Sequence, residues 1–73
     1  MGKAEITNNI RKLRFNRDEM TQQALADKVG VTRQTIVAIE KGNYSPSLEL
    51  AFRIARVFGA TVEEVFSFEE KDS

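Results

Sequence analysis

A chain of 73 residues is long enough for one small domain, and 41% hydrophobic with 30% charged residues is typical of a folded globular protein. The absence of cysteine and histidine excludes disulfides and thiolate metal sites, and removes the usual general base. We therefore expect neither an enzyme nor a metal or cofactor. No apolar run approaches the about 20 residues of a membrane span and the first residues show no secretory pattern, so we expect a cytoplasmic protein without a membrane partner.

The first predicted helix runs from about residue 8 to residue 17, with Thr7 or Asn8 as its cap and Ile10 facing inward. Phe15 lies about 140° from Ile10 around this helix. Two interpretations stay open for Phe15. Either it is a lone exposed apolar residue, or the C-terminal part of the chain or a partner subunit covers it.

Residues 21–42, TQQALADKVGVTRQTIVAIEKG, predict two short amphipathic helices joined by a tight turn. Thr21 is a good N-cap for the first helix, and Gly30 can end it in a left-handed conformation. Thr32 can cap the second helix, which ends before Gly42. Glycine in a three-residue turn between two crossed helices is the signature of the DNA-binding helix-turn-helix.

The second helix of this motif has one face for the core and one for a partner. At about 100° per residue, Ile36 and Ile39 fall on one side. The opposite side carries side-chain types that read base edges in the major groove. A solvated helix face is the alternative, but the turn and first helix favour DNA reading. We expect base contacts from Arg33, Gln34, Val37 and Ala38.

A second group of residues flanks the predicted reading face and is expected to contact the DNA backbone. Gln22 stands in the first turn of the first motif helix, and Thr32 caps the second. Beyond the second helix come three polar residues, for which a solvated turn is the alternative. The expected backbone contacts are Gln22, Thr32, Lys41, Asn43 and Tyr44.

The next predicted helix begins with Ser45 as N-cap and Pro46 at its first helical position. It runs to Phe58, where Gly59 terminates it. Its apolar arc of about 240° predicts burial on nearly all sides.

Thr61 and Glu64 form a capping-box pattern that predicts a last short helix. This helix and the following tail carry more apolar surface than so small a chain can hide, and such surface usually marks an interface. We therefore expect a homodimer joined through residues 61–73, with Val62, Val65, Phe66 and Phe68 at the interface.

The neutral net charge is unusual for a DNA-binding protein. From Val62 onward the chain has five acids and one base, so residues 1–61 carry a net charge of +4. This modest charge predicts weak, salt-dependent non-specific affinity, with specificity resting on base contacts and dimerisation.

The motif resembles the Cro- and phage-repressor-type helix-turn-helix family, also called the xenobiotic-response-element family. Gln opens the first helix, Leu-Ala follows, Gly lies in the turn, and Ile-Glu-x-Gly closes the second helix. The likeness continues through YSPSLELAFRIARVFGATVEEVF and covers roughly residues 8 to 66.

This resemblance implies an all-α, five-helix lambda-repressor-like domain spanning residues 1–73. It also implies a small antiparallel sheet between KAEIT and FSFEE, whose alternation permits pairing, whereas frayed tails are the alternative. Arg14 and Glu40 match the positions of an internal ion pair in the family. The chain has one residue more between Arg14 and Met20 than the commonest family spacing.

These features favour a sequence-specific double-stranded DNA-binding transcriptional regulator, a repressor that binds a palindromic operator as a homodimer. No small-molecule ligand is expected, because so small a core leaves no obvious pocket. Two alternatives remain: an antitoxin that regulates its own gene, and a protein-interaction module that has kept the fold without DNA binding.

Overall fold

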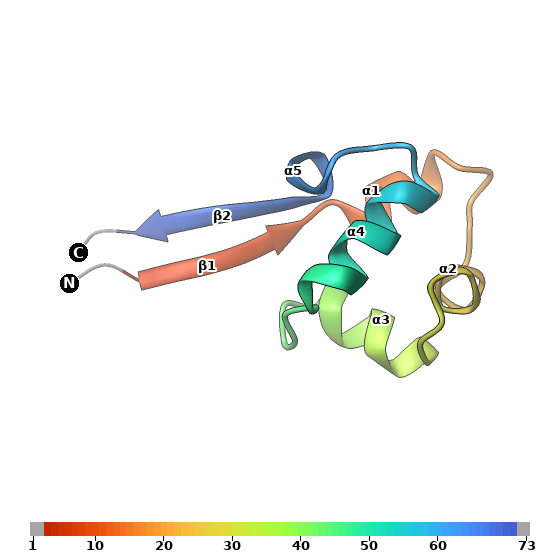
Figure 1. The fold of residues 1–73 in the computed structure, drawn as a ribbon, viewed down its shortest axis with the longest axis horizontal. Coiled ribbons are helices and arrows are strands. Elements are labelled where there is room, and N and C mark those ends of the chain that lie inside the picture. Colours follow the sequence, from red (N-terminus) through yellow and green to blue (C-terminus); the bar gives the residue numbers. More distant parts are fainter. Residues whose placement is uncertain (1–2, 72–73) are drawn as a thin grey trace.

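The computed structural model describes residues 3–71 as five helices flanked by two strands. The helices gather in one body, and the strands form a ribbon that extends away from it (Figure 1). This arrangement confirms the predicted all-α domain with a small sheet. The elements are β1 (Lys3–Asn8), α1 (Ile10–Phe15), α2 (Gln22–Val29), α3 (Arg33–Glu40), α4 (Leu48–Val57), α5 (Val62–Val65) and β2 (Phe66–Lys71).

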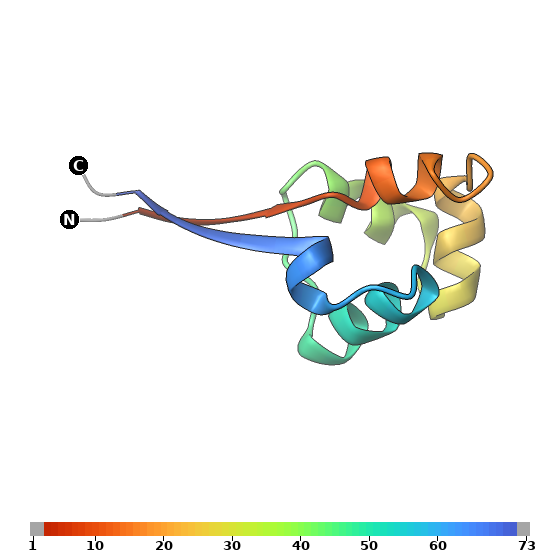
Figure 2. The ribbon, with the colours of Figure 1, turned by 90° about the horizontal axis from the view of Figure 1, so that it is seen from above.

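The ribbon is antiparallel, with Lys3 opposite Lys71 at one end and Asn8 opposite Phe66 at the other. It leaves the helical body between α1 and α5 (Figure 2). Ile6 pairs with Phe68, and directly opposed residues point to the same face of a sheet. The two tails are therefore paired rather than frayed, and one face of the ribbon carries apolar side chains.

The core draws apolar side chains from all five helices, and among the described side chains no polar or charged one is buried. The largest fully buried side chains are Ile10, Leu25, Ile36, Ile39, Ile54 and Val65. Ile36 and Ile39 commit one face of α3 to this core, as predicted. None of the helices within residues 3–71 is long and apolar enough to cross a membrane.

Local hydrogen bonds build the turn between α2 and α3. Thr21 Oγ1 accepts from the Ala24 N–H at 3.0 Å, and Thr32 Oγ1 accepts from the Thr35 N–H at 3.3 Å. Gly30 adopts φ of 78°, and its N–H donates to the Ala26 carbonyl at 2.9 Å. An L-residue rarely adopts this conformation, so glycine ends α2 and lets the chain turn into α3.

The first helix is shorter than predicted, because β1 continues through Asn8 and Asn9 occupies the N-cap position. The Asn8 side chain accepts from the Ile10 N–H at 3.2 Å and donates to the Ile39 carbonyl at 2.9 Å. Asn8 therefore links the end of the ribbon to α1 and α3 instead of capping a longer helix.

Phe15 is the last residue of α1, and its side chain is exposed. Cover by the C-terminal segment is excluded for the described residues, because β2 pairs with β1 and extends away from the helical body (Figure 1). A lone exposed residue and a contact with a partner subunit remain the two interpretations.

The start of α4 lies two residues later than predicted. Ser47, not Ser45, is the N-cap, since its Oγ accepts from the Leu50 N–H at 3.2 Å. Pro46 consequently precedes the cap instead of occupying the first helical position. The helix ends at Val57, one residue earlier than expected.

Burial of α4 on nearly all sides is also wrong. Leu48 is 71% exposed and Phe52 is 52% exposed, because the other helices cover only one side of α4. Apolar residues therefore extend around more of α4 than the small helical body can cover.

The capping box of α5 is present as predicted: Glu64 N–H donates to Thr61 Oγ1 at 3.1 Å, and Thr61 N–H donates to Glu64 Oε1 at 2.8 Å. Val65 is fully buried in the core, so the expectation that it lies at a subunit interface is corrected. Val62 and Phe66 are partly buried against the core, whereas Phe68 is 66% exposed.

Candidate nucleic-acid interface

The face of α3 opposite Ile36 and Ile39 is open. Arg33 and Gln34 are exposed, and Val37 and Ala38 are half-buried beside them. This face therefore offers a guanidinium, an amide and two small apolar groups to a partner. Such groups can pair with guanine, with adenine and with the thymine methyl group.

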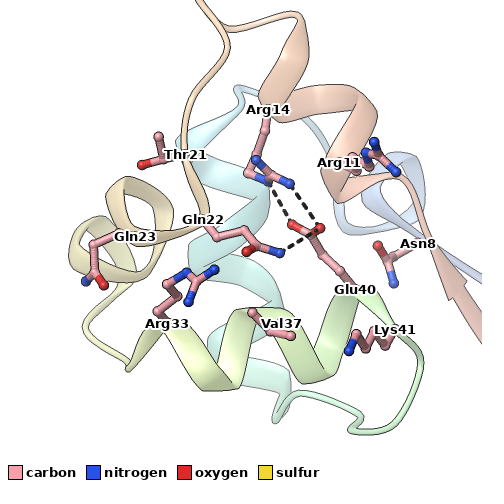
Figure 3. Close-up of a pocket in the computed structure, with 10 residues that line it drawn as sticks. All are labelled: Asn8, Arg11, Arg14, Thr21, Gln22, Gln23, Arg33, Val37, Glu40 and Lys41. Carbon is pink, nitrogen blue, oxygen red and sulfur yellow. Dashed lines mark hydrogen bonds and ion pairs between the residues drawn. The ribbon is translucent and has the colours of Figure 1, made fainter.

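An open pocket of about 780 Å³ lies beside this face, between α1, the start of α2 and α3 (Figure 3). Four cationic side chains line it against a single carboxylate, so it is positive although the whole chain is formally neutral. The lining residues are Asn8, Arg11, Arg14, Thr21, Gln22, Gln23, Arg33, Val37, Glu40 and Lys41.

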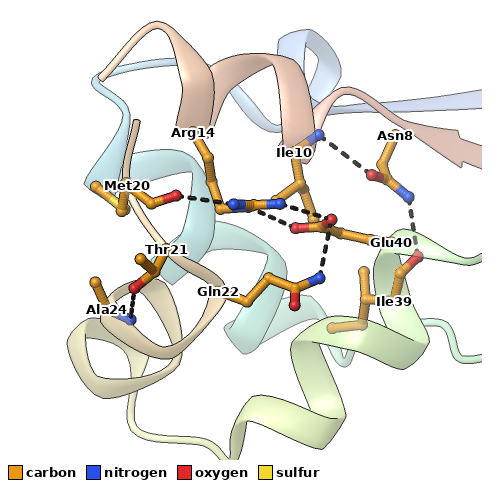
Figure 4. Close-up of polar contacts among 9 residues, drawn as sticks. All are labelled: Asn8, Ile10, Arg14, Met20, Thr21, Gln22, Ala24, Ile39 and Glu40. Carbon is orange, nitrogen blue, oxygen red and sulfur yellow. Dashed lines mark hydrogen bonds and ion pairs between the residues drawn. The ribbon is translucent and has the colours of Figure 1, made fainter. Parts of the chain in front are cut away.

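The ion pair implied by the family resemblance is present (Figure 4), and both of its residues line the pocket. Arg14 Nε lies 2.7 Å from Glu40 Oε2, and Arg14 Nη2 donates to Glu40 Oε1 at 3.0 Å. A third Arg14 nitrogen, Nη1, donates to the Met20 carbonyl at 2.8 Å. The two side chains are 14% and 10% exposed, so this bidentate pair joins α1, the connection before α2 and α3 in a partly dry site.

Gln22, an expected backbone contact, belongs to the same network. Its Nε2 donates to Glu40 Oε1 at 3.3 Å, and its side chain is half-buried at the pocket. Glu40 thus holds the Gln22 amide at the start of α2.

The other expected backbone contacts lie in two places. Lys41 is exposed at the end of α3 and lines the pocket, and Thr32 is exposed while it caps α3. Asn43 and Tyr44 are exposed in the turn beyond α3. Tyr44 lines a different hollow of about 280 Å³, between the α2–α3 turn and the start of α4. The pocket therefore brings together Gln22 and Lys41 but not Tyr44.

Four residues that line the pocket were not predicted as site residues: Asn8 and Thr21, which were predicted only as helix caps, and Arg11 and Gln23. Arg11 precedes Arg14 by three residues, which places both on one side of a helix. Once Arg14 is paired with Glu40, Arg11 has to lie near α3 as well. That spacing was a usable signal.

The chain matches the Helix-turn-helix family model over residues 10–65. It is 52% identical to an HTH-type transcriptional regulator of Methanocaldococcus jannaschii, covering 84% of this chain and 96% of that one. A second such regulator, from Archaeoglobus fulgidus, is 54% identical over 84% of this chain and 82% of the relative. The phage CTXphi transcriptional repressor RstR of Vibrio cholerae is 38% identical, over 89% of this chain and 58% of RstR.

The open face of α3, the glycine turn before it and these similarities agree with one another. The chain carries a DNA-binding helix-turn-helix, and its relatives are transcriptional regulators. This protein belongs to the Cro- and phage-repressor-type helix-turn-helix family of transcriptional regulators.

Proposed function

We propose that this protein is a repressor that binds a specific double-stranded DNA sequence by inserting α3 into the major groove. The observation that carries the proposal is the open face of α3, which stands beside a positive pocket. In this role Arg33 and Gln34 form hydrogen bonds with base edges, and Val37 and Ala38 make apolar contacts with thymine methyl groups.

Backbone contacts then fix the position of α3 in the groove. The Gln22 amide, oriented by Glu40, and the exposed Lys41 contact phosphates on the pocket side. Thr32, Asn43 and Tyr44 are exposed at the two ends of α3, where they contact the backbone.

The proposed active form is a homodimer joined through α5 and the ribbon. Ile6, Val62, Phe66 and Phe68 line a hollow of about 490 Å³, and Phe68 is largely exposed beside it. A two-stranded ribbon is only marginally stable in water by itself. Packing of another surface against its apolar face would therefore stabilise the ribbon. A second copy provides matching apolar surface under two-fold symmetry, and two α3 helices then face a palindromic operator.

Repression is supported by the similarity to RstR, which is named as a transcriptional repressor. Occupancy of the operator by the dimer would block the polymerase. The protein would act in the cytoplasm of a prokaryotic cell, where its operator lies.

Selection of bound duplexes from a random library tests the proposal, because it reports sequence, symmetry and spacing together. We expect enrichment of a palindrome whose half-sites are centred about 10 base pairs apart, or a multiple of that distance. Failure to enrich any sequence, with binding that does not change with salt, would instead indicate a protein-interaction module.

A further inference from the structure

We infer that Arg11 is a further ligand of the backbone phosphate that Gln22 and Lys41 are proposed to contact at the pocket between α1, α2 and α3. Arg11 lies in α1, outside the helix-turn-helix motif. This inference rests on the proposed DNA-binding function and extends it to a residue of the first helix.

The position of Arg11 supports this role. Arg11 is exposed and lines the pocket from α1, while Arg33 and Lys41 line it from the two ends of α3 (Figure 3). The pocket thus draws exposed cations from two helices that are far apart in the sequence. These cations surround the Arg14–Glu40 pair, whose two charges offset each other.

The ion pairs of the described residues show which cations already have a carboxylate partner. Arg14 pairs with Glu40, and Arg53 pairs with Glu49 on the surface of α4. Among the described side chains, residues 5–69, no ion pair engages Arg11, Arg33 or Lys41. Three cations without a carboxylate partner at one opening favour an anion from outside the chain. A phosphodiester oxygen suits a guanidinium, which donates two parallel hydrogen bonds to an oxyanion.

The residues that line the pocket indicate the source of that anion. Arg33 and Val37 belong both to the pocket wall and to the proposed reading face. A duplex that admits α3 into its major groove therefore brings a strand of its backbone to the edge of the same opening. A free phosphate ion would have the same chemistry, so the experiment has to separate the two sources.

The test compares Arg11→Gln with Lys12→Gln in the full chain. Both variants remove one exposed cation from α1, but Lys12 lines a neighbouring hollow and not this pocket. Affinity for one fixed duplex is measured between 50 and 200 mM salt. We expect Arg11→Gln to reduce the steepness of log K against log salt by about 0.9, the value of one lost phosphate contact. Lys12→Gln should leave the steepness near that of the unaltered protein.

Arg11→Gln should also weaken binding by the same factor on selected and on random duplexes, because a phosphate contact carries no sequence information. Thermal unfolding of both variants checks that the fold is intact. Equal steepness for the two variants would overturn the inference, and so would a loss confined to particular base pairs. A flat salt dependence of the unaltered protein would instead refute the proposed function itself.

A second arm uses inorganic phosphate as the probe, compared with chloride at constant ionic strength. We expect no Arg11-dependent rise in the melting temperature in phosphate. If phosphate stabilises the protein, and this effect disappears in Arg11→Gln while the DNA salt dependence does not change, the pocket is a site for free anions and the inference is wrong.

Discussion

Removal of the Glu40 carboxylate tests whether the ion pair with Arg14 stabilises the contact between α1 and α3. Glu40→Ala leaves the Arg14 guanidinium in a site where its side chain is 14% exposed, with no carboxylate to accept its hydrogen bonds. The Gln22 amide loses the same acceptor. Both α1 and the start of α2 therefore lose a direct link to α3.

The magnitude follows from the burial of this pair. Breaking a buried ion pair by removing one partner costs about 3–5 kcal/mol. Because Arg14 keeps its bond to the Met20 carbonyl and water reaches part of the site, we expect about 3 kcal/mol. A domain of this size has a total stability of about 4–11 kcal/mol. The melting temperature should then fall by more than about 12 °C.

Urea unfolding at one fixed protein concentration measures this loss. Glu49→Ala is the matched control, because it breaks the pair with Arg53, whose side chains are 55% and 73% exposed. Exposed pairs within a helix contribute about 0.3–0.5 kcal/mol, so the control should change stability little. The double variant Arg14→Met, Glu40→Leu removes both charges and should recover most of the lost stability. Similar losses for Glu40→Ala and Glu49→Ala would refute the argument.

Three further predictions concern packing, capping and assembly. Ile54→Ala opens a cavity at a fully buried position and should cost about 2–5 kcal/mol, measured by urea unfolding. Thr61→Ala removes one half of the capping box and should cost about 1 kcal/mol in the same assay, whereas no change would show that the cap is dispensable. Phe68→Ser should shift the protein toward monomer in sedimentation velocity, while Leu48→Ser, at a comparably exposed site on α4, should not; equal behaviour of the two variants would contradict the proposed interface.

Features set by short stretches of the chain could be predicted from the sequence. The threonine caps, the left-handed Gly30 and the capping box at Thr61 each depend on residues within three or four positions. The cap of α4 was misassigned because two serines flank Pro46, and the sequence pattern does not distinguish which hydroxyl accepts from the helix. The short α1 depends on Asn8, whose contact with Ile39 spans 31 positions.

Features set by packing between helices could not be predicted to the same extent. In the connection before Met20, Asp18 and Glu19 adopt φ of 55° and 53°, a left-handed conformation that the sequence pattern did not predict. The pocket depends on how α1 crosses α3, so Arg11 was missed although its spacing from Arg14 was informative. Val65 and Phe68 look alike in an apolar pattern, and only the packing of α5 separates the core residue from the exposed one.

Base discrimination by Gln34→Ala tests most directly whether the open face of α3 reads DNA. Binding of the variant and of the unaltered protein is measured on the selected operator and on its single base-pair substitutions. We predict a loss of about 1–3 kcal/mol confined to one or two positions, with relaxed preference there. An equal loss on every duplex, or no loss on any, would contradict a base-reading role for this face.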